Sequence, residues 1–189
     1  MSPSRPLQGY WDEDDYLSLD TNHLVEFSDG MIEVLPMPTT KHQQVVAFLY
    51  GLIFSFVSSR SRGEVLFAPL PVRVWPRKYR EPDVVFMSAE HSERVQKEFW
   101  EGADLAVEVV SEDPESVKRD WEKKRADYER AGIAEYWVVD PKRGVMTMFA
   151  LVQGRYVVHA EGRAGQVVSS KLLAGLDVDV SAVLASGQL

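Results

Sequence analysis

Two short apolar runs, separated by a longer amphipathic stretch, dominate the middle of the chain. Residues 105–110 and 136–139 are rich in Val and aromatic side chains, which is typical of buried strands. Between them, after a Ser-Glu-Asp-Pro sequence at 111–114, apolar residues recur every three or four positions and predict a helix near 115–131. The order strand, helix, strand predicts a right-handed crossover between two parallel strands.

The same patterns predict the remaining elements. We expect helices over 11–19 and 40–58, a helical or partly irregular segment over 88–100, a hairpin of 24–27 with 31–35, strands within 64–75 and at 84–87, a hairpin of 145–151 with 156–160, and a short strand at 178–180 before a polar end. Thr39 or Thr40 caps the second helix. Residues 1–10 are interpreted as a loose N-terminal arm of one domain covering 1–189. The fold class is therefore α/β (α+β), with a central mixed β-sheet flanked by helices.

Composition narrows the class of protein. The chain has 189 residues, of which 45% are hydrophobic and 26% charged, as in an ordinary globular domain. It contains no cysteine, which excludes disulfides and a zinc–thiolate site. The longest apolar stretch, residues 45–57, is shorter than the roughly 20 residues of a membrane span, and the first residues lack an apolar signal core. We therefore expect no membrane association and a cytoplasmic protein.

The net charge of −8 argues against tight, non-specific binding of nucleic acid through a broad basic face. It does not exclude a metal-dependent enzyme, because a bound cation partly neutralises the carboxylates around it.

The central unit contains an acidic and a basic residue at positions where charge is costly. Glu108 lies within the first apolar run, and a carboxylate in a buried strand needs compensation. The apolar stripe of the helix is formed by Val117, Trp121, Tyr128 and Ala131. Lys124 lies on this stripe, whereas Lys123 points away from it. We predict that Lys124 faces Glu108. The alternative is a lysine whose stem covers apolar surface while its ammonium reaches water.

Three further residues are candidates for a functional site, and each of them also has a simpler structural interpretation. Asp83 follows Pro82 at the entrance of a strand, where it is either functional or a turn aspartate. His42, in the first turn of a core helix, is either a structural histidine or part of a site. Glu26, on a short strand, faces either solvent or a cleft.

Asp83, Glu108 and Lys124 together suit one kind of chemistry. Two carboxylates, with the Val109 carbonyl as a further ligand, can hold a hard divalent cation through oxygen. Such an ion lowers the pKa of bound water and polarises a phosphoryl oxygen. An ammonium nearby stabilises the charge that develops during phosphodiester hydrolysis, or orients the attacking water.

The chain also resembles a known family, the Uma-type endonuclease group of the PD-(D/E)xK restriction-endonuclease-like superfamily. The resemblance spans about residues 11–183 and is carried by 26–30 (EFSDG), His42, 81–84 (EPDV), 107–111 (VEVVS), Asp120, Lys124, Tyr128, Gly132 and 135–141 (EYWVVDP). It implies a restriction-endonuclease-like fold with Mg²⁺ at the carboxylates that match Asp83 and Glu108. The usual lysine of the superfamily would fall at position 110, which is Val110 here. In the family that this chain resembles, the lysine lies on the following helix and corresponds to Lys124.

Together these observations predict an Mg²⁺- or Mn²⁺-dependent DNA endonuclease. Asp83, Glu108 and the Val109 carbonyl would bind the metal, Lys124 would complete the catalytic set, and Glu26 and His42 would be secondary site residues. The alternatives are a non-catalytic nucleic-acid-binding or accessory protein that retains the nuclease fold, and a hydrolase of another phosphoester. We also expect a homodimer, because a run of aromatic and Met side chains presents more apolar surface than we expect one short hairpin to bury. These are Tyr136, Trp137, Met146, Met148 and Phe149.

Overall fold

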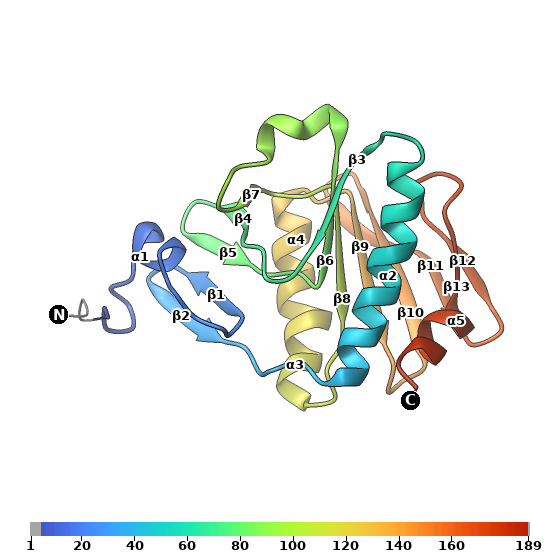
Figure 1. Cartoon of the computed structure of the whole chain (residues 1–189), viewed down its shortest axis with the longest axis horizontal. Coiled ribbons are helices and arrows are strands. Elements are labelled where there is room, and N and C mark those ends of the chain that lie inside the picture. Colours follow the sequence, from blue (N-terminus) through green and yellow to red (C-terminus); the bar gives the residue numbers. More distant parts are fainter. Residues whose placement is uncertain (1–4, 189) are drawn as a thin grey trace.

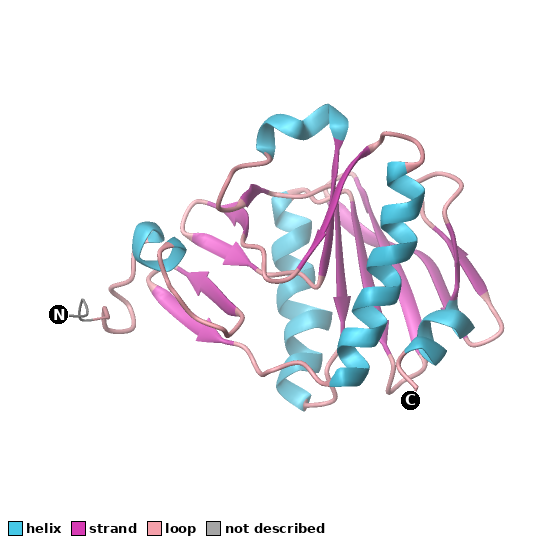
Figure 2. Ribbon diagram, in the orientation of Figure 1, coloured by secondary structure: helices cyan, strands magenta, loops and turns pink. Residues whose placement is uncertain are grey.

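A six-stranded mixed sheet forms the centre of the computed structural model, which describes residues 5–188 (Figures 1 and 2). Its strands, in spatial order, are β11 (Arg155–Arg163), β10 (Val145–Val152), β9 (Glu135–Asp140), β8 (Leu105–Val109), β6 (Val84–Ser88) and β3 (Gly63–Phe67). β8 and β9 are parallel, and the other neighbouring strands in this sheet are antiparallel. The predicted fold class and the predicted parallel pair are therefore confirmed.

Helices cover both faces of this sheet (Figure 1). One face packs against α2 (Thr40–Ser58), which is capped by Thr39 through a bond from the His42 amide. The other face packs against a helical segment made of α3 (Pro114–Lys118), η2 (Arg119–Lys124) and α4 (Arg125–Ala131). Because β8 is buried on both sides, its residues are almost all apolar and alternate between the two cores.

A smaller sheet lies beside the first, at the left of Figure 1. Its order is β2 (Met31–Val34), β1 (Val25–Ser28), β5 (Lys78–Arg80), β4 (Val72–Trp75) and β7 (Trp100–Glu101). The predicted hairpin is the β1–β2 pair. A short helix, α1 (Glu13–Leu17), packs against it through Tyr16. Part of the expected loose arm is attached: Gln8 and Gly9 hydrogen-bond to residues of this hairpin, while residues 1–4 lie outside the described part.

The C-terminal part confirms one expectation and adds an element. β10 and β11 form the predicted hairpin, and β13 (Asp177–Asp179) pairs with β12 (Val167–Ser169). The end of the chain is not simply polar, because α5 (Val180–Ser186) buries Val180 and Val183 in the core beside α2. Residues 88–100 are partly irregular as expected, with a 3₁₀ helix η1 (Ala89–Arg94).

The reason given above for a homodimer is wrong. The aromatic and Met side chains on which that prediction rested are all buried within a single chain: Tyr136, Trp137, Met146, Met148 and Phe149. They fit because the two faces of β9 and β10 contribute to separate cores, each covered by helices. The homodimer itself stays a prediction, to be tested by light scattering at micromolar concentration.

Among residues 5–188, the helices lack the combination of length and apolar character that a bilayer crossing requires.

Candidate functional site

Two acidic residues meet where β6 begins and β8 ends. β6 and β8 pair with Val84 opposite Val107, and continuing this register by one residue places Asp83 opposite Glu108. The Val109 amide donates to Asp83 Oδ2 over 2.7 Å, which fixes the aspartate at the strand entrance. Asp83 is therefore more than a turn residue, because it ties the start of β6 to the end of β8.

The helix above these strands differs from the predicted one. Instead of one α-helix it contains a π-helical segment, η2, between α3 and α4. A π turn holds more residues than an α turn, so positions four apart stay close to one line. The buried line is accordingly Ser116, Asp120, Lys124 and Tyr128, whereas the predicted stripe residues Val117, Trp121 and Ala131 are only half-buried. π turns inside helices are frequent at functional sites.

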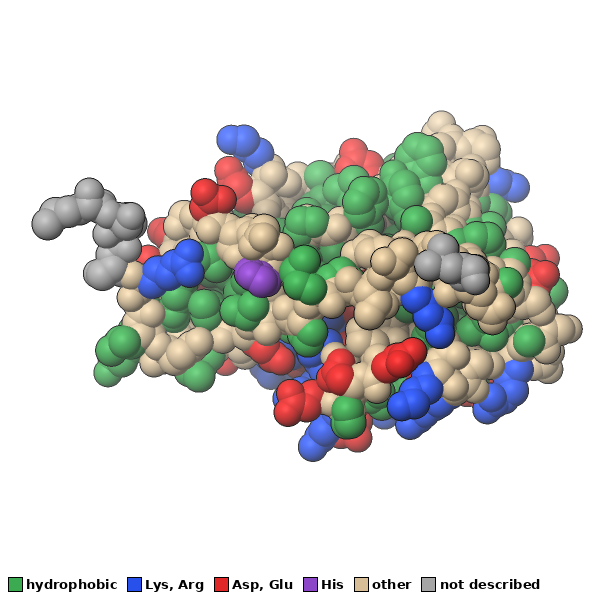
Figure 3. Space-filling model, turned by 60° about the horizontal axis from the view of Figure 1, so that its bottom comes forward, with side chains coloured by type: hydrophobic (Ala, Val, Ile, Leu, Met, Phe, Trp, Pro, Cys, Tyr) green, Lys and Arg blue, Asp and Glu red, His purple; other side chains and the backbone are tan. Residues whose placement is uncertain are grey.

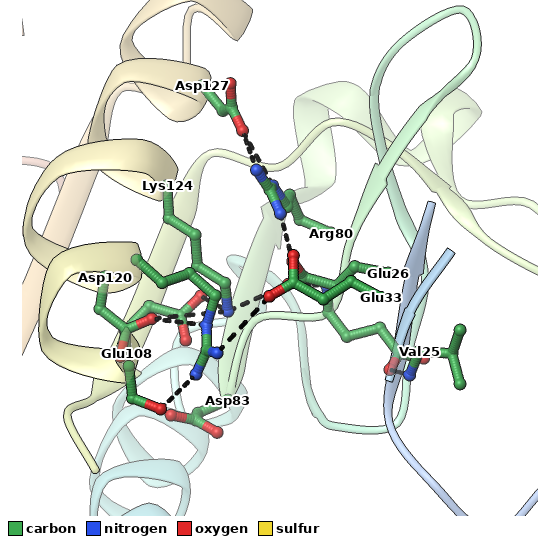
Figure 4. Close-up of polar contacts among 12 residues, drawn as sticks. Val25, Glu26, Glu33, Arg80, Asp83, Glu108, Asp120, Lys124 and Asp127 are labelled. Atoms are coloured by element: carbon green, nitrogen blue, oxygen red, sulfur yellow. Dashed lines mark hydrogen bonds and ion pairs between the residues drawn. The ribbon is translucent and has the colours of Figure 1, made fainter. Parts of the chain in front are cut away.

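Lys124 lies on this line and is 2% exposed, whereas Lys123 is exposed. Its Nζ donates to Glu108 Oε1 over 2.9 Å, and it lies 3.1 Å from Glu26 Oε1 and 3.9 Å from Asp120 Oδ1 (Figure 4). The ammonium therefore does not reach out to water along the helix surface. Three carboxylates from three different elements surround it.

The protonation state of this cluster follows from burial and from pairing. Burial would lower the pKa of Lys124, but Glu108, Glu26 and Asp120 outweigh it and hold the pKa above its ordinary value. Burial raises the pKa of Glu108, and Lys124 opposes that rise. We take the ion pair as the dominant state at neutral pH, because the two groups are 2.9 Å apart and Tyr128 also donates to the same Glu108 oxygen over 2.8 Å.

Glu26 is buried and faces the site rather than solvent. Burial would raise its pKa, but Lys124 and Arg80 lower it to about 2. Arg80 bonds Glu26 on one side and donates from Nε to Asp127 of α4 over 2.8 Å on the other. β1, β5 and the helical segment are thus held together by alternating charges, which orient the Glu26 carboxylate toward Lys124.

His42 also reaches the site, from the first turn of α2. Its Nε2 lies 3.3 Å from Asp83 Oδ2. Burial would lower the pKa of His42, but Asp83 and the Val109 carbonyl outweigh it and raise that pKa. Its Nδ1 is buried without a hydrogen-bond partner among the described residues, so His42 is not a fully satisfied structural histidine.

These side chains line a pocket of about 30 Å³, which Asp83, Glu108, Val109, Asp120 and Lys124 share with His42 and Arg119. A volume of that size holds one or two water molecules, or an ion with part of its hydration shell.

Sequence reasoning did not assign Asp120 or Arg119 to the site, although Asp120 was among the residues that carry the resemblance. The four-residue spacing between Asp120 and Lys124 is the sequence signal that could have indicated it. Burial raises the pKa of Asp120 to about 6, against the opposing effect of Lys124 and Arg119.

The donor set fits a hard divalent cation. In residues 5–188, Asp83 Oδ1 and Glu108 Oε2 receive no hydrogen bond, because the partners named above use Oδ2 and Oε1. Asp120 Oδ1 is buried without a hydrogen-bond partner in the same part of the chain. No three His, Asp or Glu side chains there converge into a ready-made metal site. Mg²⁺ needs only one or two carboxylates and keeps several waters.

A mixed sheet between helices, with an acidic pair where two central strands meet, defines the restriction-endonuclease-like class of α/β fold. The model of the Uma2 family, described as "Putative restriction endonuclease", matches residues 13–181, and the chain belongs to this family. A solved structure described as a putative nuclease belonging to DUF820, from Anabaena variabilis ATCC 29413, is similar in fold. Its TM-score is 0.73 at 17% identity, over 92% of this chain and 97% of that one. No curated protein matches this chain.

Proposed function

We propose that this protein is a metal-dependent DNA endonuclease that hydrolyses phosphodiester bonds at the pocket between β6, β8 and η2. Membership in a family of restriction-endonuclease type supports nuclease function in general. The observation that carries the proposal is the buried Lys124 ammonium, 2.9 Å from Glu108 at the floor of a pocket that Asp83 also lines. A binding protein has no need for an acid pair beside a fully buried cation, since burying such charges is costly.

Asp83 and Glu108 would hold Mg²⁺ or Mn²⁺ through their free oxygens, with the Val109 carbonyl as a third ligand. When bound, the ion lowers the pKa of a coordinated water and polarises the phosphoryl oxygen. The Val109 amide keeps Asp83 in place over 2.7 Å. The Tyr128 hydroxyl does the same for Glu108 over 2.8 Å. Both carboxylates are therefore oriented before substrate binds.

Lys124 would supply the positive charge that the developing pentavalent phosphate requires. Its raised pKa keeps it protonated at neutral pH, so it acts as a donor and not as a general base. Glu26 and Asp120 hold Nζ from two further sides, which limits its motion. His42, in contact with Asp83, would position that carboxylate.

The test is cleavage of supercoiled plasmid and of single-stranded DNA in Mg²⁺ or Mn²⁺. Wild-type protein should nick, and Glu108→Ala and Asp83→Ala, purified identically, should not. Glu122→Ala is the matched control, because Glu122 is an exposed acid on the same helical segment. Activity that persists in Glu108→Ala would come from a contaminant and would remove the proposal.

One observation favours the alternative of a non-catalytic nucleic-acid-binding protein. In the described residues, the acidic groups nearest Lys124 are already paired, and no three-ligand metal site is formed. Such a protein would bind DNA equally well with and without Mg²⁺ and would cleave neither DNA nor an activated phosphodiester. The third reading, a hydrolase of another phosphoester, predicts cleavage of the activated phosphodiester but not of DNA.

A further inference from the structure

A second cavity lies directly beside the acidic pocket. Its volume is about 230 Å³, and it shares Leu24, Pro38 and Asp83 with the acidic pocket. The two cavities therefore meet at Asp83 and at the segment that leads into β1. A ligand whose phosphate lies against Asp83 and Glu108 has its neighbouring group within reach of this second space.

The chemistry of the second cavity is different from that of the first. Apolar groups of Leu24, Met37, Val46 and Pro69 form part of its wall. Thr21, Asn22, His23 and Gln43 add hydroxyl, amide and imidazole groups. Among the described residues, Asp83 is the only Asp, Glu, Lys or Arg that lines it, so a phosphate would meet one carboxylate and neither a Lys nor an Arg there. A neutral, planar, hydrogen-bonding ring suits these walls better.

We propose that this cavity receives the base of the nucleotide that adjoins the scissile phosphate, so that the substrate is single-stranded DNA or DNA with an unpaired nucleotide. This inference rests on the proposed function. A base inside a duplex is stacked on both sides and hydrogen-bonded to its partner, and it must leave the stack before it can enter a side pocket. Sequence-tolerant contacts with unstacked bases are typical of proteins that bind single strands.

Two other observations support a single strand. A third cavity, of about 140 Å³, shares Thr21, His23 and Pro69 with the second and Glu81 with the acidic pocket, so further space adjoins both. On the face shown in Figure 3, acidic and basic side chains of the described residues are interspersed and form no continuous basic band. With a net charge of −8, duplex binding through many phosphate contacts is disfavoured. Contacts to bases can supply part of the binding affinity that phosphate contacts would otherwise provide.

The experiment measures binding by fluorescence anisotropy in Ca²⁺, which supplies a divalent cation while cleavage is monitored separately in Mg²⁺. The probes are a single-stranded oligonucleotide, the blunt duplex of the same sequence, and the same strand with every base replaced by an abasic residue. Wild-type protein should bind the intact strand about tenfold more tightly than the abasic strand, because a base in the cavity removes apolar surface from water. It should also bind the intact strand more tightly than the duplex.

The cavity is tested with Val46→Met, which extends an apolar chain from the buried wall into the space without adding a ring that could stack. The ratio of intact-strand to abasic-strand affinity should fall toward one. Ser55→Met is the matched control, because Ser55 is exposed on the same helix and lines neither cavity. It should keep the wild-type ratio, and thermal unfolding of both variants checks that they fold.

Equal binding of intact and abasic strands by wild-type protein would overturn the inference, as would duplex binding as tight as single-strand binding. An unchanged ratio in Val46→Met would overturn the assignment to this cavity. The same measurements distinguish failure of this inference from failure of the proposed nuclease function. Base-dependent binding without any Mg²⁺-dependent cleavage would leave the cavity assigned and remove the nuclease, whereas duplex cleavage without base preference would do the reverse.

Discussion

Lys124→Met is the most informative single change, because it removes a charge from the centre of the site while keeping most of the stem. The three carboxylates around Nζ would be affected differently. Glu26 keeps its bond to Arg80, and Asp120 keeps Arg119 at 3.5 Å. Among the residues that the structure describes, Glu108 keeps only the Tyr128 hydroxyl, at 2.8 Å. The substitution therefore leaves mainly Glu108, which is buried on strand β8, without a positively charged partner.

Lys124→Met should change two quantities, the free energy of unfolding and the rate of cleavage. Removing one partner of a buried ion pair costs about 3–5 kcal/mol of unfolding free energy. Part of this is recovered if Glu108 takes up a proton, which burial already favours by raising its pKa. In the reaction, loss of a donor that stabilises developing charge lowers the rate about 10²–10³-fold. A folded variant with little activity is the expected result.

The assay is single-turnover DNA cleavage in saturating Mg²⁺, with urea unfolding of the same preparations. Lys123→Met is the internal control, because Lys123 is adjacent in sequence but exposed. Its unfolding free energy should stay within about 0.5 kcal/mol of the wild-type value. Its cleavage rate should be unchanged.

Two outcomes would refute the reasoning. Equal rate losses in Lys124→Met and Lys123→Met would mean that positive charge acts through the general field and not through a placed donor. No rate loss in Lys124→Met, in protein shown to be folded, would mean that Lys124 only neutralises buried acids.

Three further predictions test the site. In calorimetric titration with Mn²⁺, the double variant Asp83→Ala, Glu108→Ala should lose binding, and unchanged binding would place the metal elsewhere. Because the folded pKa of Glu26, about 2, is below the ordinary value of 4.5, its contribution to stability is present above pH 4.5 and is lost as the pH falls toward 2. Urea unfolding should therefore show a Glu26→Gln deficit at pH 6 that shrinks by pH 3, and a constant deficit would contradict the low pKa. Tyr128→Phe removes a buried hydrogen bond to a carboxylate and should lower the unfolding free energy by about 1.5–3 kcal/mol, as measured at pH 7. A variant as stable as wild type would show that this hydroxyl contributes nothing.

The sequence by itself determined the central unit. Two apolar runs, the first interrupted only by Glu108, marked β8 and β9, and the helical pattern between them indicated a crossover, so their parallel pairing could be predicted. Glu108 and Lys124 stood out because each placed a charge on a face that its neighbours made apolar. Local periodicity carries this kind of information, since it decides which face of an element is buried.

The sequence did not determine which distant residues share that burial. Glu26 lies on the smaller sheet and precedes Lys124 by 98 positions, yet the two side chains form an ion pair. Nothing in the short pattern of β1 indicates this pairing. Asp120 joins the site because a π turn shifts the helix face, and an α-helical stripe predicts half-buried Val117 and Trp121 instead. The aromatic residues of β9 and β10 suggested a partner chain, yet helices on both faces of the sheet cover them. In each case packing between elements far apart in sequence determined which side chains are buried together, because the free energy of burying a group depends on everything that surrounds it.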